Sequence, residues 1–86
     1  MKKTRLSQSK NAIGHRVRRA RLEKTPRVSQ EDLSGRLAAQ GVQITQTGIS
    51  KIEGGTRYVM DYEALAIARA LKVSIAWLYG ETNASR

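Results

Sequence analysis

The stretch TQTGISKIEGG at residues 45–55 predicts a short helix over about 46–53 with one buried and one exposed side. Ile49 and Ile52 are three residues apart, so they lie on the same face of a helix. Thr45 is a favourable N-cap, and the two glycines that end the stretch are a favourable stop. We therefore expect a helix that packs through its two isoleucines and leaves its other side in solvent.

The exposed side of this predicted helix carries four polar residues, which are Gln46, Thr47, Ser50 and Lys51. Such side chains can make the hydrogen bonds that base edges offer in the major groove of DNA. Alternatives stay open, because all four could be ordinary surface residues. Ser50 could instead bond a nearby backbone carbonyl, and Lys51 could contact a phosphate. In a basic chain, a short helix of this kind favours an element that reads DNA.

The net charge of +9 is concentrated in the first third of the chain. Residues 1–27 contain ten Lys or Arg against one acid, whereas residues 28–86 contain six basic and six acidic residues. A basic cluster attracts polyphosphates through counterion release, and its affinity for them falls as salt rises. We expect a flexible basic arm over 1–11. For residues 2–5 alone, DNA contact and a merely solubilising tail are equally supported, whereas the whole basic cluster favours DNA. The arm residues that could contact DNA are Lys2, Lys3 and Arg5.

The composition excludes several other classes of protein. The chain has no cysteine and one histidine, so disulfides, cysteine zinc sites and multi-histidine metal sites are ruled out. Gly54 and Gly55 follow a predicted helix, whereas a phosphate-binding glycine loop precedes one. No apolar run is long enough to cross a membrane, and the N-terminus lacks the apolar segment of a signal peptide. We expect no enzyme activity, metal, cofactor or small-molecule ligand, and a cytoplasmic, nucleoid-associated protein encoded by a bacterium or a phage.

Another helix is predicted near the N-terminus, over about 12–24. Ser9 or Asn11 would cap it, and Ile13 and Val17 would face the core. It ends before the sequence Thr-Pro-Arg, because a residue that precedes proline is pushed out of the α region.

The capping box SQED at residues 29–32 begins the next predicted helix, which buries its two leucines. Residues 38–40 extend this helix by about one turn before a glycine. Val42 or Ile44 then packs back on the core, before the helix with the exposed polar side begins.

Two more helices are predicted in the C-terminal third, over about 61–71 with Asp61 as its cap, and over about 75–79. Together the predicted helices make an all-α, compact bundle of about five short helices over 12–80. A disordered tail over 81–86 follows. The residues expected to face the core are Leu65, Ala68 and Leu71 in the first of these helices and Trp77, Leu78 and Tyr79 in the second. For the last three, the alternative is a dimer contact or a docking surface for a second domain.

The stretches SQEDL, GISKIEGGTR and YEALAIARALKVSIAWLYGE, in this order, resemble the helix-turn-helix domain of the Xre and phage-repressor (cI/Cro) family. The resemblance runs from about Ile13 to Glu81. Its most specific pieces are I-S-x-I-E-x-G at 49–55, A-x-A-L-x-V-S at 68–74 and W-L-x-G-E at 77–81. It implies a lambda-repressor-like DNA-binding domain.

The resemblance implies a role for each exposed residue of the helix over 46–53. Gln46 and Thr47 would meet base edges in the major groove first. Ser50 and Lys51 would follow one turn later. The phosphate contacts that the resemblance implies are made by Gln30, Thr56, Arg57 and Tyr58.

The resemblance also implies a structural ion pair between Arg21 and Glu53, which fixes the base-reading helix against the first helix. It implies a sequence-specific regulator of transcription that binds double-stranded DNA. Such a regulator would be a repressor that occupies an operator as a homodimer on two half-sites. The alternative is a protein-interaction module, such as the antitoxin of a toxin–antitoxin pair.

The sequence departs from the family pattern in the two connections that flank the second helix. The connection between Arg21 and Ser29 is about two residues longer than usual, and that between Leu37 and Thr45 is about five residues longer. The second connection matters more, because it sets the angle between the two helices of the motif.

Overall fold

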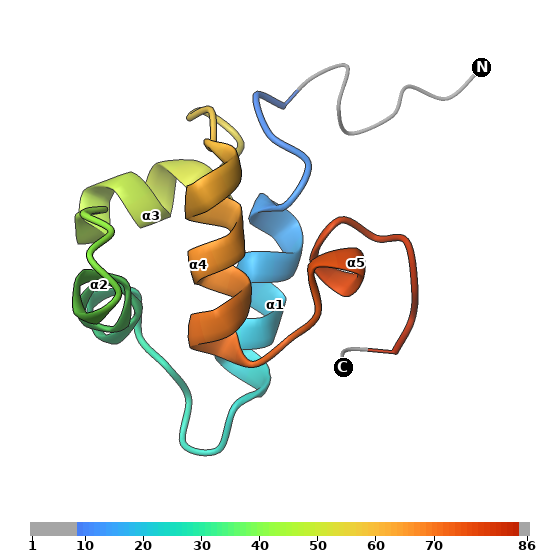
Figure 1. The fold of residues 1–86 in the computed structure, drawn as a ribbon, viewed down its shortest axis with the longest axis horizontal. Helices are drawn as coiled ribbons and strands as arrows, with labels where there is room; N and C mark the ends of the chain where they lie inside the picture. The colour runs from blue at the N-terminus through green and yellow to red at the C-terminus, as the bar shows by residue number, and fades with distance from the viewer. Residues whose placement is uncertain (1–8, 85–86) are drawn as a thin grey trace.

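The structure, a computed structural model, describes residues 9–84, and within them the chain forms five α-helices and no strand (Figure 1). The helices are α1 (Gly14–Glu23), α2 (Gln30–Ala39), α3 (Gln46–Glu53), α4 (Asp61–Leu71) and α5 (Ile75–Leu78). α4 packs across α1, with α2 and α3 on one side of α4 and α5 on the other (Figure 1). The predicted all-α fold of five short helices is confirmed.

Side-chain caps fix the beginnings of three helices. The Ser29 hydroxyl accepts a hydrogen bond from the Asp32 N–H at 2.9 Å, and the Asp32 carboxylate accepts one from the Ser29 N–H at 3.2 Å. This is the capping box that the sequence predicted for α2. The Thr45 hydroxyl caps α3 by accepting a hydrogen bond from the Gly48 N–H, and the Ser74 hydroxyl caps α5 by accepting one from the Trp77 N–H. α3 therefore begins and ends at the predicted residues.

One apolar core joins all five helices. The two leucines of α2 and the two isoleucines of α3 are completely or almost completely buried in it. Because closely packed side chains leave a helix little freedom to rotate, this core sets which side of α3 faces solvent. The largest fully buried side chains are Ile13, Val17, Leu33, Leu37, Ile49, Ile52, Ile67, Leu71 and Leu78.

Two residues expected in the core lie at the surface instead. Leu65 is 42% exposed, because the inner stripe of α4 runs through Ala64, Ile67 and Leu71 and places Leu65 on the outer side. Tyr79 is 43% exposed, because α5 ends one residue earlier than predicted and only its Trp77 and Leu78 side chains turn inward. Both predictions were wrong.

The connection between α2 and α3 packs as predicted. Ile44 is buried and Val42 is partly buried against the core. The Ser34 hydroxyl donates to the Ile44 carbonyl at 2.6 Å, and the Gln40 amide donates to the Ala66 carbonyl at 2.9 Å. The longer connection is therefore held on both sides, by α2 and by α4.

Residues 1–8 and 85–86 lie outside the described part of the chain, and with them Lys2, Lys3 and Arg5. For these residues the flexible arm and the disordered tail stay predictions. Residues 9–11, which were also assigned to the arm, are described, and Asn11 is buried and bonded to the Ile52 and Arg57 carbonyls. Between residues 9 and 84, none of the helices has the length and apolar character needed to span a membrane.

Candidate nucleic-acid interface

α3 presents a polar outer side. Its two isoleucines point into the core, and Thr45 fixes its first turn by accepting a hydrogen bond from the Gly48 N–H at 3.1 Å. The helical period then directs the remaining side chains away from the core. The side chains exposed on this outer side are those of Gln46, Thr47, Ser50 and Lys51.

The first residues of α2 and α3 are joined directly. The Gln46 side-chain amide donates a hydrogen bond to the side-chain oxygen of Gln30 at 2.6 Å. The Gln30 amide in turn donates to Glu53, at the end of α3, at 3.0 Å. Gln30 and Gln46 border an open depression of about 440 Å³ beside the N-terminal ends of both helices. Two glutamines expected to contact DNA therefore lie side by side.

Arg21 and Glu53 form a two-pronged ion pair between α1 and α3. The Arg21 Nε and Nη2 atoms donate to the two Glu53 oxygens, each at 2.7 Å, and Nη1 donates to the Val28 carbonyl at 3.0 Å. The two side chains are 8% and 5% exposed. Hydrogen bonding to Glu53 raises the pKa of Arg21 above its usual value, although burial acts in the opposite direction.

These contacts make one continuous chain of hydrogen bonds, which we call the Arg21–Gln46 network. It consists of Arg21, Glu53, Gln30 and Gln46. The network links a buried arginine of α1 to an exposed glutamine at the start of α3. The orientation of the Gln46 amide is therefore tied to the packing of the core.

Arg57, expected to contact a phosphate, is engaged within the protein. Its Nη1 and Nη2 atoms donate to the two Glu63 oxygens, both at 3.1 Å, and Nη1 also donates to the Tyr58 carbonyl. The Arg57 side chain is 31% exposed, whereas that of Glu63 is 7% exposed. Glu63 also accepts a hydrogen bond from the Met60 N–H at 2.9 Å. This pair therefore holds the α3–α4 loop against α4.

Sequence reasoning missed Glu63, although its position carried a signal. It predicted Asp61 as the cap of α4, but Met60 is the N-cap and Asp61 is the first helical residue. Glu63 is thus the third helical residue, where a glutamate commonly reaches back to the N-cap N–H.

Glu63 leads to a prediction about pH. Hydrogen bonds from Arg57 lower the pKa of the Glu63 carboxyl below its usual 4.5, helped by the Met60 N–H and opposed by burial. A carboxyl whose pKa is lower in the folded state stabilises the fold above its unfolded pKa, and this stability is lost as the pH falls through the folded pKa. The free energy of unfolding should therefore decrease below about pH 4.5.

Urea unfolding of Glu63→Gln across this pH range measures the effect. We expect the variant to show a smaller decrease on acidification than the unsubstituted protein. Glu81→Gln is the control, because Glu81 is exposed and forms no ion pair within residues 9–84. A decrease as steep in Glu63→Gln as in the unsubstituted protein would contradict the prediction.

Asn11 connects the start of α1 to the end of α3. Its side-chain amide donates to the Ile52 and Arg57 carbonyls, at 3.0 and 2.9 Å. Its side-chain oxygen accepts from the Ile13 and Gly14 N–H groups, at 3.0 and 2.7 Å. The sequence suggested Ser9 or Asn11 as a cap of this helix but gave no sign of the contact with α3.

Gly14, the first residue of α1, lies directly against α3. A Cβ atom at this position would overlap the Ile52 carbonyl oxygen and lie 2.9 Å from the Ile52 carbonyl carbon. Glycine therefore permits the close approach of α1 and α3. This contact was also missed, because nothing in the sequence near Gly14 distinguishes it from an ordinary helix start.

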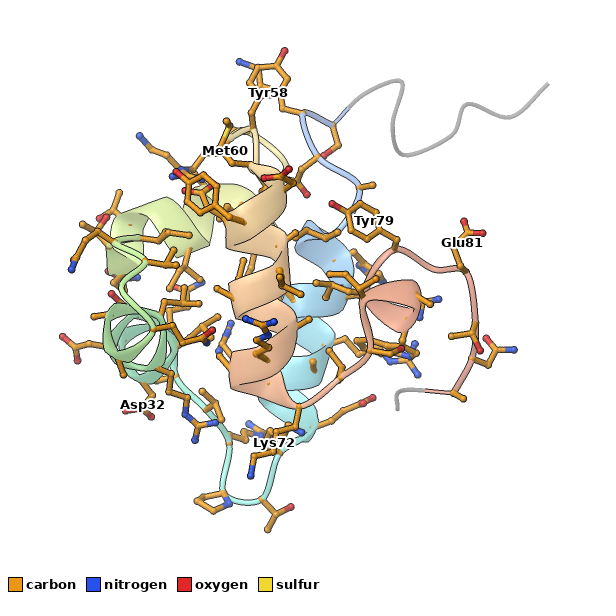
Figure 2. All side chains as sticks on the ribbon, in the orientation of Figure 1. Asp32, Tyr58, Met60, Lys72, Tyr79 and Glu81 are labelled. Carbon is orange, nitrogen blue, oxygen red and sulfur yellow. The ribbon has the colours of Figure 1, made fainter. Side chains whose placement is uncertain are left out.

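Two further residues expected to contact phosphates are exposed in the α3–α4 loop. Thr56 follows the end of α3, and its hydroxyl donates to the Lys51 carbonyl at 3.3 Å. The Tyr58 side chain is 69% exposed and projects from the end of the molecule (Figure 2). Across residues 9–84, no group of His, Cys, Asp or Glu is arranged to hold a metal ion.

Comparison with known proteins shows the family to which the chain belongs. The model of the helix-turn-helix family matches residues 27–78, which is more than half of the chain. The matched segment contains α2, α3, α4 and α5, and so includes the two helices whose first residues are joined by Gln30 and Gln46. No curated protein and no solved structure matches the chain. The chain belongs to the helix-turn-helix family, a family of DNA-binding regulators.

Proposed function

We propose that this chain is a sequence-specific regulator of transcription that binds double-stranded DNA and represses by occupying an operator. The observation that carries the proposal is the outer side of α3, where Gln46, Thr47, Ser50 and Lys51 are exposed on a helix fixed by the core and by the Arg21–Glu53 ion pair. A short polar helix held this rigidly suits the major groove, which admits one α-helix.

The Gln30–Gln46 pair supports a specific mode of base recognition. One N–H of the Gln46 amide is used by Gln30, which leaves the second N–H and the side-chain oxygen available. A glutamine in this state can donate to N7 of adenine and accept from its N6 amino group. Thr47, Ser50 and Lys51 would contact neighbouring bases or phosphates along α3.

Backbone contacts would set the position of α3 in the groove. Gln30 begins α2, so a phosphate there would also meet the free N–H groups of the first helical turn. Thr56 and Tyr58 would hold the strand after α3. Arg57 would contribute positive charge, and its guanidinium would contact a phosphate while staying bonded to Glu63.

We further propose that two copies bind a palindromic operator, with half-sites about 34 Å apart, which is one turn of DNA. The predicted arm, with Lys2, Lys3 and Arg5, would add phosphate contacts that weaken as salt rises. The proposed location is the cytoplasm of a bacterial cell, where the operator is accessible.

Selection from a random duplex pool, followed by binding measurements on the enriched duplex, tests the proposal. Gln46→Ala and Lys51→Ala should each weaken binding to that duplex by roughly 1–3 kcal/mol per lost base contact. The unfolding midpoint should change little, because both side chains are exposed.

Gln43→Ala is the matched control, because Gln43 is an exposed glutamine in the connection before α3. It should leave operator binding unchanged. The proposal fails if selection enriches no sequence, or if Gln46→Ala and Gln43→Ala have the same effect on operator binding.

A further inference from the structure

Lys10 has no role in the interface described so far, yet the structure fixes its position beside the end of α3. Its backbone N–H donates to the Gly55 carbonyl at 2.9 Å. Ser9 lies against Gly55, and Asn11 donates to two carbonyls at the end of α3 and in the following loop. The backbone on both sides of Lys10 is therefore attached to the turn that follows α3.

The Lys10 side chain lies over the Tyr58 ring, with its Nζ atom 5.4 Å from the ring centroid. The face of an aromatic ring attracts a cation at this distance. Lys10 is itself exposed, and Tyr58 is 69% exposed. Figure 2 shows Tyr58 projecting from the end of the molecule. An ammonium group thus lies over the face of an exposed phenol ring.

The surroundings of this pair favour a negatively charged ligand. The three ion pairs among residues 9–84 involve Arg19, Arg21 and Arg57, so Lys10 has no carboxylate partner there. Glu63, the acid that holds the same loop, is almost fully buried and bonded to Arg57. The exposed Thr56 lies in the same loop, where its hydroxyl donates to the Lys51 carbonyl.

We propose that Lys10 and Tyr58 together bind one DNA phosphate beside the C-terminal end of α3. The inference rests on the proposed function, because the ligand is the backbone of the duplex that α3 reads. The Lys10 ammonium pairs with the phosphate, and the Tyr58 hydroxyl donates to one of its oxygens. The ring limits the freedom of the lysine side chain before binding, so less entropy is lost when the phosphate arrives.

The salt dependence of duplex binding tests this proposal. The unsubstituted chain, Lys10→Gln, Tyr58→Phe, Tyr58→Ala and the Lys10→Gln/Tyr58→Ala double variant are titrated with the enriched duplex from about 50 to 200 mM salt. Lys72→Gln is the matched control, because it removes the same charge from an exposed lysine at the opposite end of the molecule (Figure 2). Urea unfolding of each variant shows whether the fold is kept.

Lys10→Gln should reduce the slope of log affinity against log salt by about 0.9, the value for one phosphate. The loss of affinity would then be about three- to fourfold larger at 50 than at 200 mM salt. Tyr58→Phe should weaken binding without changing the slope, and Lys10→Gln should have less effect when Tyr58 is alanine. Lys72→Gln should keep the full slope.

Equal slopes for Lys10→Gln and the unsubstituted chain would overturn the proposal, and so would equal changes in Lys10→Gln and Lys72→Gln. Lys10→Gln could also lower the unfolding midpoint and leave the slope of log affinity against log salt unchanged. The Lys10–Tyr58 pair would then only attach the N-terminal segment to the fold, and the proposal would again be overturned. In each case the proposed function stands if an operator was enriched. If the unsubstituted chain binds no duplex, both proposals fail.

Discussion

Replacing Glu53 with alanine should lower the free energy of unfolding by about 3–5 kcal/mol, because it leaves the Arg21 charge buried without a partner. The two side chains are 8% and 5% exposed, so water cannot readily replace the lost carboxylate. Gln30 would lose its acceptor as well. Stabilities of about 5–15 kcal/mol are usual for a domain, so urea unfolding would show a much lower midpoint.

Glu23→Ala provides a matched control. Glu23 also pairs with an arginine of α1, at 3.0 Å, but the two side chains are 52% and 60% exposed. An exposed pair of this kind contributes only about 0.3–0.5 kcal/mol. Replacing both Arg21 and Glu53 with apolar residues should cost less than Glu53→Ala alone. Similar midpoints for Glu53→Ala and Glu23→Ala would show that the buried pair is not needed for stability.

Gly14→Ala should destabilise the protein by about 1–3 kcal/mol, although alanine is the better helix former. The added methyl group would overlap the Ile52 carbonyl, and a backbone atom cannot move aside as a flexible side chain can. α1 and α3 would have to separate, which would also disturb the Arg21–Gln46 network. Urea unfolding measures the loss, and duplex binding measures the displacement of α3.

Gly35→Ala is the matched control for this substitution. Gly35 lies in α2, and a Cβ atom there would meet nothing within 4 Å. Alanine at an exposed helical position should stabilise the fold by about 0.4–1 kcal/mol, because it restricts the unfolded chain. The two glycine-to-alanine substitutions should thus have opposite signs. Destabilisation of equal size in both would show that the contact with Ile52 is not the cause.

Much of the fold could be predicted because its signals are local. A cap, a three-residue spacing of isoleucines and a terminal glycine pair lie within eleven residues and define α3. α4 is different, since apolar residues are found around most of this helix. The helical period alone therefore does not show which face is buried. The placement of Leu65 in the core failed because the buried stripe of α4 runs through Ala64, Ile67 and Leu71 and leaves Leu65 on the outer side.

The candidate site was predictable where exposure follows from helix geometry, as for Gln46 and Lys51. The contacts that hold the site in place were harder to predict. The sequence alone does not tell whether a loop arginine binds a phosphate or an acidic side chain that the fold brings near. The Arg57–Glu63 pair was therefore missed. Asn11 and Gly14 meet α3 about forty residues further along the chain, and a single sequence carries no local sign of such contacts.

The shared Glu53 carboxylate has a consequence for how this protein could evolve. It accepts hydrogen bonds from both Arg21 and Gln30. The same carboxylate therefore neutralises the buried Arg21 charge and orients Gln30, which in turn orients Gln46. Mutations at Glu53 would therefore be selected against before their effect on target choice could matter. Thr47, Ser50 and Lys51 make no side-chain hydrogen bond within residues 9–84, so the stability of the fold does not depend on which residues stand there. If α3 reads DNA as proposed, new target preferences would arise at these three positions, within an inherited framework.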